Sequence, residues 1–250
     1  MVRTWTIAVA GLVLMSACGS GDEGGVFVSE EAAAGEVAAV TSPTTIPTST
    51  TIAMPTTTTV PEPVFTSSIE PVSADQLGVS WRAGCPVAPE DLRRIELTHW
   101  DDGGVATTGA LVVHADHADD VATVFERLFA AGFPVHSMKP IVEFAGDDEA
   151  SMRANNTSAF NCREIDGRPG VWSQHAFGGA VDINPLVNPW VRGGRVDPPE
   201  GAPFVDRDAS VAGLIVAGDA VTDAFADVGW GWGGDWANAL DYQHFSHNGR

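Results

Sequence analysis

The sequence predicts an α+β domain over residues 73–250, with a small antiparallel sheet and flanking helices. Three observations support this prediction. Two apolar segments flank a turn near residue 100, two amphipathic helices lie far apart in the chain, and strands and helices do not alternate as in βαβ folds. A segment of this length can bury one good core.

The predicted sheet begins with a hairpin. Residues 94–100 alternate apolar and polar side chains, with Ile95 and Leu97 on one face, as in a half-buried strand. The sequence Asp-Asp-Gly-Gly at 101–104 predicts a turn, and the apolar residues 110–113 predict the returning strand.

Two helices are predicted after the hairpin. The first covers residues 121–129 and ends at Gly132 and Pro134, and the second covers residues 219–227 and ends at Gly229. Their apolar side chains recur at helical spacing and are expected to face the core. These side chains are Val121, Val124, Phe125, Leu128, Phe129, Val221, Ala224, Phe225 and Val228.

The N-terminal segment, residues 1–17, is predicted to be an export signal. Arg3 precedes an uncharged apolar run that is too short to span a bilayer, which needs about twenty residues. Small residues then lead into Cys18, in an arrangement that resembles the lipobox of bacterial lipoproteins. The resemblance implies that Cys18 is lipidated; the alternative is a plain secretory peptide with an incidental cysteine.

Residues 18–72 are rich in small and polar residues, with a Thr/Pro-rich run at 41–59. Such a segment buries too little apolar surface to offset its ordering entropy, so we expect an extended tether. Signal, lipid and tether together predict an extracytoplasmic domain that is anchored to the membrane and faces the cell wall.

The other two cysteines, Cys85 and Cys162, are predicted to form a disulfide if Cys18 carries lipid, because the compartment would be oxidising. On the chain-entropy account, this bridge would stabilise the fold by about 4 kcal/mol. A zinc site built from cysteines would need more sulfur ligands than the chain offers.

The charge of the chain limits its partners. With 33 acidic against 13 basic residues, the net charge is -20. This excludes nucleic-acid binding through basic patches and argues against adhesion to anionic lipids by charge alone. We therefore expect membrane contact through the lipid anchor only, and a monomeric protein.

Two stretches near the C-terminus combine metal-ligand side chains with glycines. His175 and Asp182 are separated by Gly178-Gly179, which permits a bend that could turn both side chains inward. Three side chains from these stretches, His175, Asp182 and His244, could bind zinc and leave a fourth position open, the pattern of a catalytic site.

Other interpretations of these stretches remain open at this point. A single histidine near glycines is more often structural than a ligand, and Trp/Gly-rich segments such as 230–236 often pack a core or bind sugars. Five further histidines receive no role, and three of them, His114, His117 and His247, are expected to be solvated or capping. The five are His99, His114, His117, His136 and His247.

The order of the motifs resembles the M15 family of zinc peptidases. Ser-x-His-x-x-Gly-x-Ala-x-Asp runs from Ser173 to Asp182, and Trp-Gly-Gly-x-Trp at 232–236 precedes Asp-x-x-His from Asp241 to His244. This family contains D-alanyl-D-alanine carboxypeptidases and L-alanyl-D-glutamate endopeptidases, which cut peptidoglycan stem peptides. The resemblance implies the fold shared with hedgehog-type domains and a zinc ion bound by His175, Asp182 and His244.

The resemblance also implies roles around the metal. Asp241 would be the general base, and Ser173 and Trp236 would lie at the substrate. An arginine upstream of the first motif would stabilise the oxyanion; Arg163 is preferred over Arg153, although the usual Gly-Tyr-Arg form is absent.

These residues predict a zinc peptidase acting on peptidoglycan peptides. The alternative is a non-catalytic, wall-binding lipoprotein that retains the fold. A third hypothesis, a hedgehog-like signalling module, is supported by the shared fold alone.

Overall fold

The computed structural model describes residues 62–207 and 210–250. The predicted signal segment, the predicted lipidation site Cys18 and the predicted tether up to residue 61 lie outside these residues. None of the helices in the described segments has the length and apolar character needed to cross a membrane.

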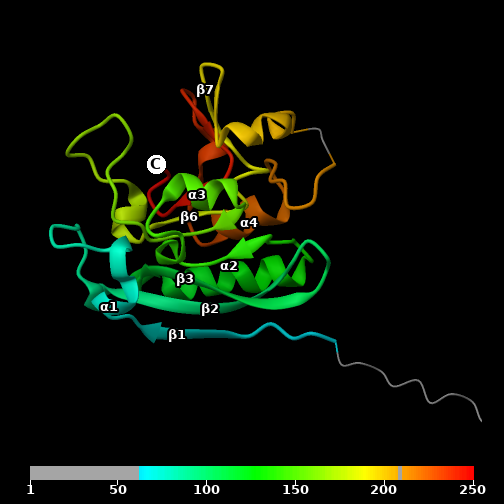
Figure 1. The fold of residues 1–250 in the computed structure, drawn as a ribbon. Coiled ribbons are helices and arrows are strands. Elements are labelled where there is room, and N and C mark those ends of the chain that lie inside the picture. Colours follow the sequence, from blue (N-terminus) through cyan, green and yellow to red (C-terminus); the bar gives the residue numbers. More distant parts are fainter. Residues whose placement is uncertain (1–61, 208–209) are drawn as a thin grey trace, which may run out of the picture. The chain divides into compact units, whose positions relative to one another are not determined.

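The first layer is an antiparallel sheet with strand order β1-β2-β3 (Figure 1). It contains β1 (Ser67–Pro71), β2 (Leu92–Trp100) and β3 (Ala106–His114). The predicted hairpin is confirmed, and both of its strands are longer than expected. Ile95 and Leu111 face each other in the register and are fully buried.

The sheet begins earlier than the boundary that the sequence predicted at residue 73. Strand β1 forms its outer edge, and Ile69 is paired with Ile95 of β2. The sequence of β1, Ser-Ser-Ile-Glu-Pro, has only one large apolar side chain, so it has no alternating pattern to reveal it. The last residues assigned to the tether therefore belong to the folded part.

Both predicted helices are confirmed, as α2 (Ala118–Ala130) and α4 (Ala220–Asp227). Asp219 accepts hydrogen bonds from the amides of Val221 and Thr222 and so caps α4 at its N-terminus. The two helices contact each other, and their apolar faces join the inner face of β2–β3 in one core. Phe129 is only partly buried, and its ring stacks on Trp100 with the centroids 4.7 Å apart.

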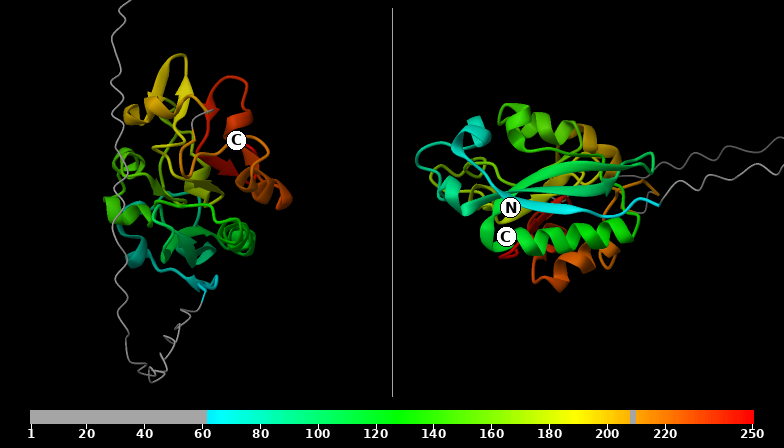
Figure 2. Two further views of the ribbon diagram at one scale, coloured as in Figure 1. Left: turned by 90° about the vertical axis from the view of Figure 1, so that its right-hand side faces the viewer. Right: turned by 90° about the horizontal axis from the view of Figure 1, so that it is seen from below.

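A second set of short strands forms two small sheets, and Val181 and Phe245 from the first of them are part of this core (Figures 1 and 2). One small antiparallel sheet has the order β6-β11-β9, and another has the order β10-β7-β8. Their bounds are β6 (Ala180–Asp182), β7 (Trp190–Arg192), β8 (Arg195–Asp197), β9 (Gly231–Trp232), β10 (Leu240–Asp241) and β11 (His244–Ser246). With the helices, these sheets make an α+β fold.

The remaining regular elements are short. The strands β4 (Ser137–Met138) and β5 (Asn156–Thr157) pair in parallel. The helices α1 (Ala74–Leu77) and α3 (Asp148–Arg153) flank the first sheet and the site.

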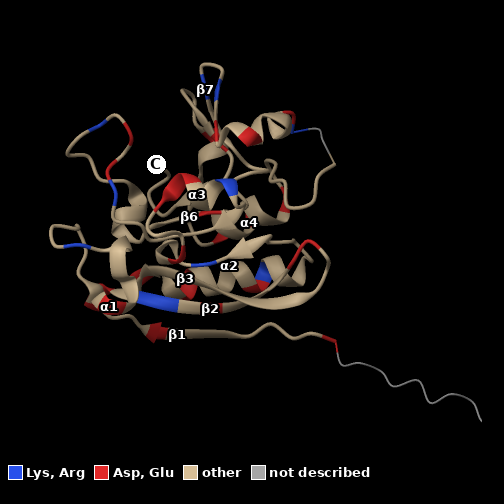
Figure 3. Ribbon diagram, viewed as in Figure 1, with Lys and Arg blue, Asp and Glu red and all other residues tan. Residues whose placement is uncertain are grey.

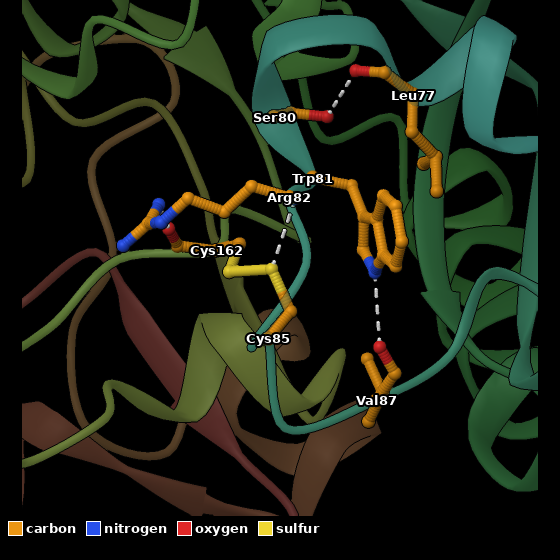
Figure 4. Close-up of a disulfide and its surroundings, with 7 residues drawn as sticks. All are labelled: Leu77, Ser80, Trp81, Arg82, Cys85, Val87 and Cys162. Carbon is orange, nitrogen blue, oxygen red and sulfur yellow. Dashed lines mark hydrogen bonds between the residues drawn. A yellow bond between two sulfur atoms is a disulfide. The ribbon is translucent and has the colours of Figure 1, made fainter.

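A disulfide links Cys85 to Cys162, with their Cα atoms 5.9 Å apart (Figure 4). The bridge joins the segment after α1 to the segment that leads into the site, across 77 residues of sequence. The guanidinium of Arg82 donates a hydrogen bond to the carbonyl oxygen of Cys162. Cys162 is thus held by both the disulfide and the hydrogen bond from Arg82, and Arg163 follows it directly in the chain.

Candidate metal centre

His175 lies in a short 3₁₀ helix, η5 (Gln174–Phe177), whose ends are fixed by its neighbours. Ser173 precedes the helix, and its hydroxyl accepts a hydrogen bond from the His175 amide. Gly178 ends it with φ 67°, a left-handed conformation that favours glycine. A Cβ at Gly178 would also lie 2.5 Å from the main-chain nitrogen of His114, so this bend needs glycine for space as well.

Asp182 and His244 meet through strand pairing. They are directly opposite in the antiparallel register of β6 with β11, although 62 residues separate them in sequence. Directly opposite side chains in such a pair lie on the same face of the sheet. The bend at Gly178 turns the chain so that His175 reaches this face too.

The three side chains converge closely and are buried. Asp182 lies with Oδ1 2.9 Å from His244 Nδ1 and Oδ2 3.1 Å from His175 Nε2. The two imidazole nitrogens are 3.3 Å apart. Zinc ligands about 2.0–2.1 Å from a tetrahedral ion are separated by about 3.3 Å, so the donor set has the composition and spacing of a zinc site.

The outer nitrogen of each imidazole faces a main-chain oxygen. His175 Nδ1 lies 2.6 Å from the carbonyl oxygen of Ala159, and His244 Nε2 lies 3.2 Å from the main-chain oxygen of Arg250. These oxygens can only accept, so the outer nitrogens carry protons. The inner nitrogens are therefore turned toward Asp182 as potential ligands.

The electrostatics of the cluster favour a cation among these atoms. Burial opposes the charge of Asp182, but His175 and His244 outweigh it and hold the pKa of this carboxyl well below its usual range. Burial likewise opposes the charged form of His244, yet its hydrogen bond to Asp182 raises the pKa of this imidazole. Without a metal, the negative charge of Asp182 and the positive charge of His244 therefore stabilise each other.

Asp241 lies beside this cluster. It ends β10, where it pairs with Trp190 of β7, and a two-residue turn separates it from His244. Its Oδ1 is buried and has no hydrogen-bond partner among the residues described. Burial raises the pKa of Asp241 to about 7; Asp182 adds to this effect, while His244, His175 and Arg163 oppose it. A carboxyl with this pKa can both accept and return a proton near neutral pH.

Arg163 and Arg153 differ in their position. Arg163 lines the same cavity as the histidines, and its Nη2 lies 2.8 Å from Asp148. Its buried Nε has no partner in the described segments, and the charges of Asp148 and Asp182 raise its pKa despite burial. Arg153 instead pairs with Glu149 on the surface of α3 and does not line this cavity.

The cluster opens into a cavity of about 1050 Å³. Trp236 forms part of its wall, and its ring centroid is 5.4 Å from that of His244. Ser173 also lines the cavity. Its hydroxyl accepts the hydrogen bond from the His175 amide, so this side chain helps to position His175 in addition to facing the cavity.

Five of the chain's 13 basic residues line this cavity, together with five aspartates. The wall is therefore close to neutral in a protein of net charge -20. Arg168 lies in the loop after Arg163 and Arg192 lies at the end of β7, and neither forms an ion pair within residues 62–207 and 210–250. Figure 3 shows basic residues on both of these segments.

Sequence reasoning missed several groups at the site. The carbonyl oxygen of Ala159, the main-chain oxygen of Arg250 and the carboxylate of Asp148 each contact a candidate site residue. Every residue has a main-chain oxygen, so no sequence pattern could have indicated the roles of the oxygens of Ala159 and Arg250. Gln243, between Asp241 and His244 in sequence, has a buried Oε1 with no partner in the described part of the chain.

The histidines without a predicted role lie outside the cluster. His114 accepts a hydrogen bond from the Asp116 amide and is a cap, as expected. His136 pairs with Asp102, and His99 is buried, with Nδ1 3.2 Å from the Trp100 carbonyl oxygen.

Comparison with known proteins found a match to the region of the chain that contains the cluster. A family model described as D-alanyl-D-alanine carboxypeptidase, of the M15 peptidases, matches residues 166–247. This segment is similar to the M15 peptidases. It includes His175, Asp182, Asp241 and His244, whereas Arg163 precedes it. No curated protein and no solved structure matches the chain.

Proposed function

We propose that this protein is a zinc-dependent peptidase that hydrolyses peptidoglycan stem peptides. The observation that carries the proposal is the buried convergence of two imidazoles and one carboxylate beside the unpartnered Oδ1 of Asp241, within the segment similar to M15 peptidases. Peptidase chemistry needs a base of this kind in a cavity that can hold a peptide.

His175, Asp182 and His244 would hold the zinc through Nε2, a carboxylate oxygen and Nδ1. When bound, zinc supplies a Lewis acid for the peptide carbonyl and lowers the pKa of water toward about 7. We expect the fold to be the one that hedgehog-type domains share with these peptidases.

The chain's own residues account for the movement of the proton. Asp241 takes a proton from the attacking water as the new C–O bond forms, and returns it to the leaving amine as the C–N bond breaks. Arg163, which lines the cavity, would keep its charge throughout and would oppose the negative charge that develops on the carbonyl oxygen. Asp148 fixes one end of its guanidinium, which limits the reorganisation needed during reaction.

The cavity suits an acidic peptide. Stem peptides carry free carboxylates, which the charge of -20 would repel from most of the surface. The cationic side chains of Arg168 and Arg192 at the cavity lower this barrier locally.

The decisive experiment incubates zinc-loaded protein with purified muropeptides and identifies the products by mass. Loss of one D-alanine would identify a D,D-carboxypeptidase, and cleavage after L-alanine would identify an L-Ala-D-Glu endopeptidase. Zinc binding without cleavage of any fragment would contradict the proposal and favour the wall-binding lipoprotein.

We also propose that the protein is exported, lipidated at Cys18 and held near the wall by the segment between Cys18 and strand β1, as a monomer. The support is the signal-like segment 1–17 and the composition of the tether. Cys18→Ala should release the protein from the membrane fraction into the soluble fraction. Retention of this variant in the membrane fraction would contradict a lipid anchor at Cys18.

A further inference from the structure

The four residues after β11, residues 247–250, turn back toward the metal centre, and we call them the C-terminal strap. The amide of Gly249 donates to the carbonyl oxygen of Ser246 at 3.1 Å. The hydroxyl of Ser246, which is fully buried, donates to the main-chain oxygen of Arg250 at 2.8 Å. The strap is thus folded against the same strand that carries His244.

The strap contacts His244 on the side away from Asp182. The main-chain oxygen of Arg250 lies 3.2 Å from Nε2 of His244. When Nδ1 serves as a ligand, Nε2 must carry the proton, and this oxygen is its acceptor. Such contacts fix the tautomer and the ring orientation of metal-binding histidines in general.

The strap also holds one wall of the cavity. Trp236 Nε1 donates to the carbonyl oxygen of Gly249 at 2.9 Å, and the Trp236 ring lies next to that of His244. Consecutive main-chain oxygens of the strap therefore bind the indole and the imidazole.

Two glycines leave the space that the strap occupies. A Cβ at Gly231 would lie 2.6 Å from the Cα of Gly249, and one at Gly179 would lie 2.4 Å from Nδ1 of His247. The His247 amide also donates to the carbonyl oxygen of Gly179. The contact of Gly231 with the strap is between main chains and cannot be relieved by a side-chain rotation.

We propose that the C-terminal strap is a positioning element that holds His244 in its metal-binding tautomer and fixes Trp236. Residues 248–250 lie beyond the segment 166–247 that is similar to M15 peptidases, so the family pattern does not assign them. The inference rests on the metal-binding part of the proposed function and is independent of which bond, if any, is cut.

The test compares two buried serines that each donate to a main-chain oxygen. Ser246→Ala removes the hydroxyl that holds the strap, and Ser80→Ala removes an equivalent hydrogen bond, to the Leu77 carbonyl oxygen, in the region of Figure 4. Zinc affinity is measured by competition with a chelator. We expect about a tenfold loss for Ser246→Ala and a larger loss, up to about a hundredfold, on deletion of residues 248–250. Ser80→Ala should bind zinc like the wild type.

A second measurement separates positioning from general destabilisation. Chemical unfolding of the metal-free variants reports stability, and long-range nitrogen NMR of the zinc-loaded protein reports the Nε2 proton of His244. We expect this proton to exchange faster with water in Ser246→Ala and in Gly231→Ala. Equal zinc affinity in all these variants, or an equal loss in Ser80→Ala, would overturn the proposal, as would failure of the wild type to bind zinc. Zinc binding without peptide cleavage would contradict the proposed peptidase only.

Discussion

His244 lies directly opposite Asp182 in the antiparallel pairing of β11 with β6, and their side chains are 2.9 Å apart. Strand register therefore builds half of the candidate metal centre. The other half comes from the bend at Gly178, which brings His175 to the same face of the sheet. A change that shifts either element would separate the ligands without altering any of them.

Asp241→Ala should bind zinc with nearly wild-type affinity and lose cleavage by about a thousandfold or more, because the base is removed and the three ligands remain. Chelator competition and muropeptide digestion measure the two properties on one sample. Asp235→Ala, an aspartate outside the lining of the cavity, is the control. An Asp241→Ala enzyme that retains high activity would refute the assignment of the base.

Arg163→Gln should reduce cleavage by about a hundredfold or more while zinc binding is retained, because a fixed charge near the carbonyl oxygen is lost. Arg153→Gln provides the matched control, since it removes a surface arginine paired with Glu149. A larger loss of cleavage in Arg153→Gln than in Arg163→Gln would contradict the assignment of Arg163 as the residue that stabilises the oxyanion.

The stability of the metal-free protein should depend on pH through Asp241. The folded state holds the Asp241 proton more tightly than the unfolded chain, because its pKa is raised from 3.8 to about 7. Its contribution to stability is therefore complete below pH 3.8 and is lost as the pH rises through about 7.

Asp241→Asn, which cannot ionise, should gain stability relative to the wild type by about 2–4 kcal/mol between pH 4 and pH 8. Urea unfolding at a series of pH values measures the difference. A constant difference over this range would show that Asp241 titrates normally.

Replacing both Cys85 and Cys162 by serine should lower the free energy of unfolding by about 2–5 kcal/mol. Activity should fall further than zinc affinity, since Cys162 directly precedes Arg163, whereas its hydrogen bonds in the described residues are to Ser80 and Arg82 and not to the candidate ligands. Unfolding curves and chelator competition on the double variant test both parts. Equal losses of activity and zinc affinity would contradict a specific role of the bridge in placing Arg163.

The sequence predicted those elements whose periodicity is local. Helix α2 and the β2–β3 hairpin follow from apolar spacing, and Gly178 indicated the bend that the site needs. The pairing of Asp182 with His244 depends on register between distant segments, which single-sequence patterns do not encode. Edge strand β1 was missed because most of its side chains face solvent.

Strands β6 and β11, which carry two of the three candidate metal ligands, pack on a core that other elements share. Val181 and Phe245, the neighbours of two ligands, are buried in the same core as Ile95 of the first sheet and Phe125 of α2. The segment 166–247 contains all the ligands but lacks the first sheet and α2, which supply much of that core. Excised from the chain, this segment would expose the apolar underside of its strands to water, so we expect residues 166–247 not to fold stably without the elements that precede them.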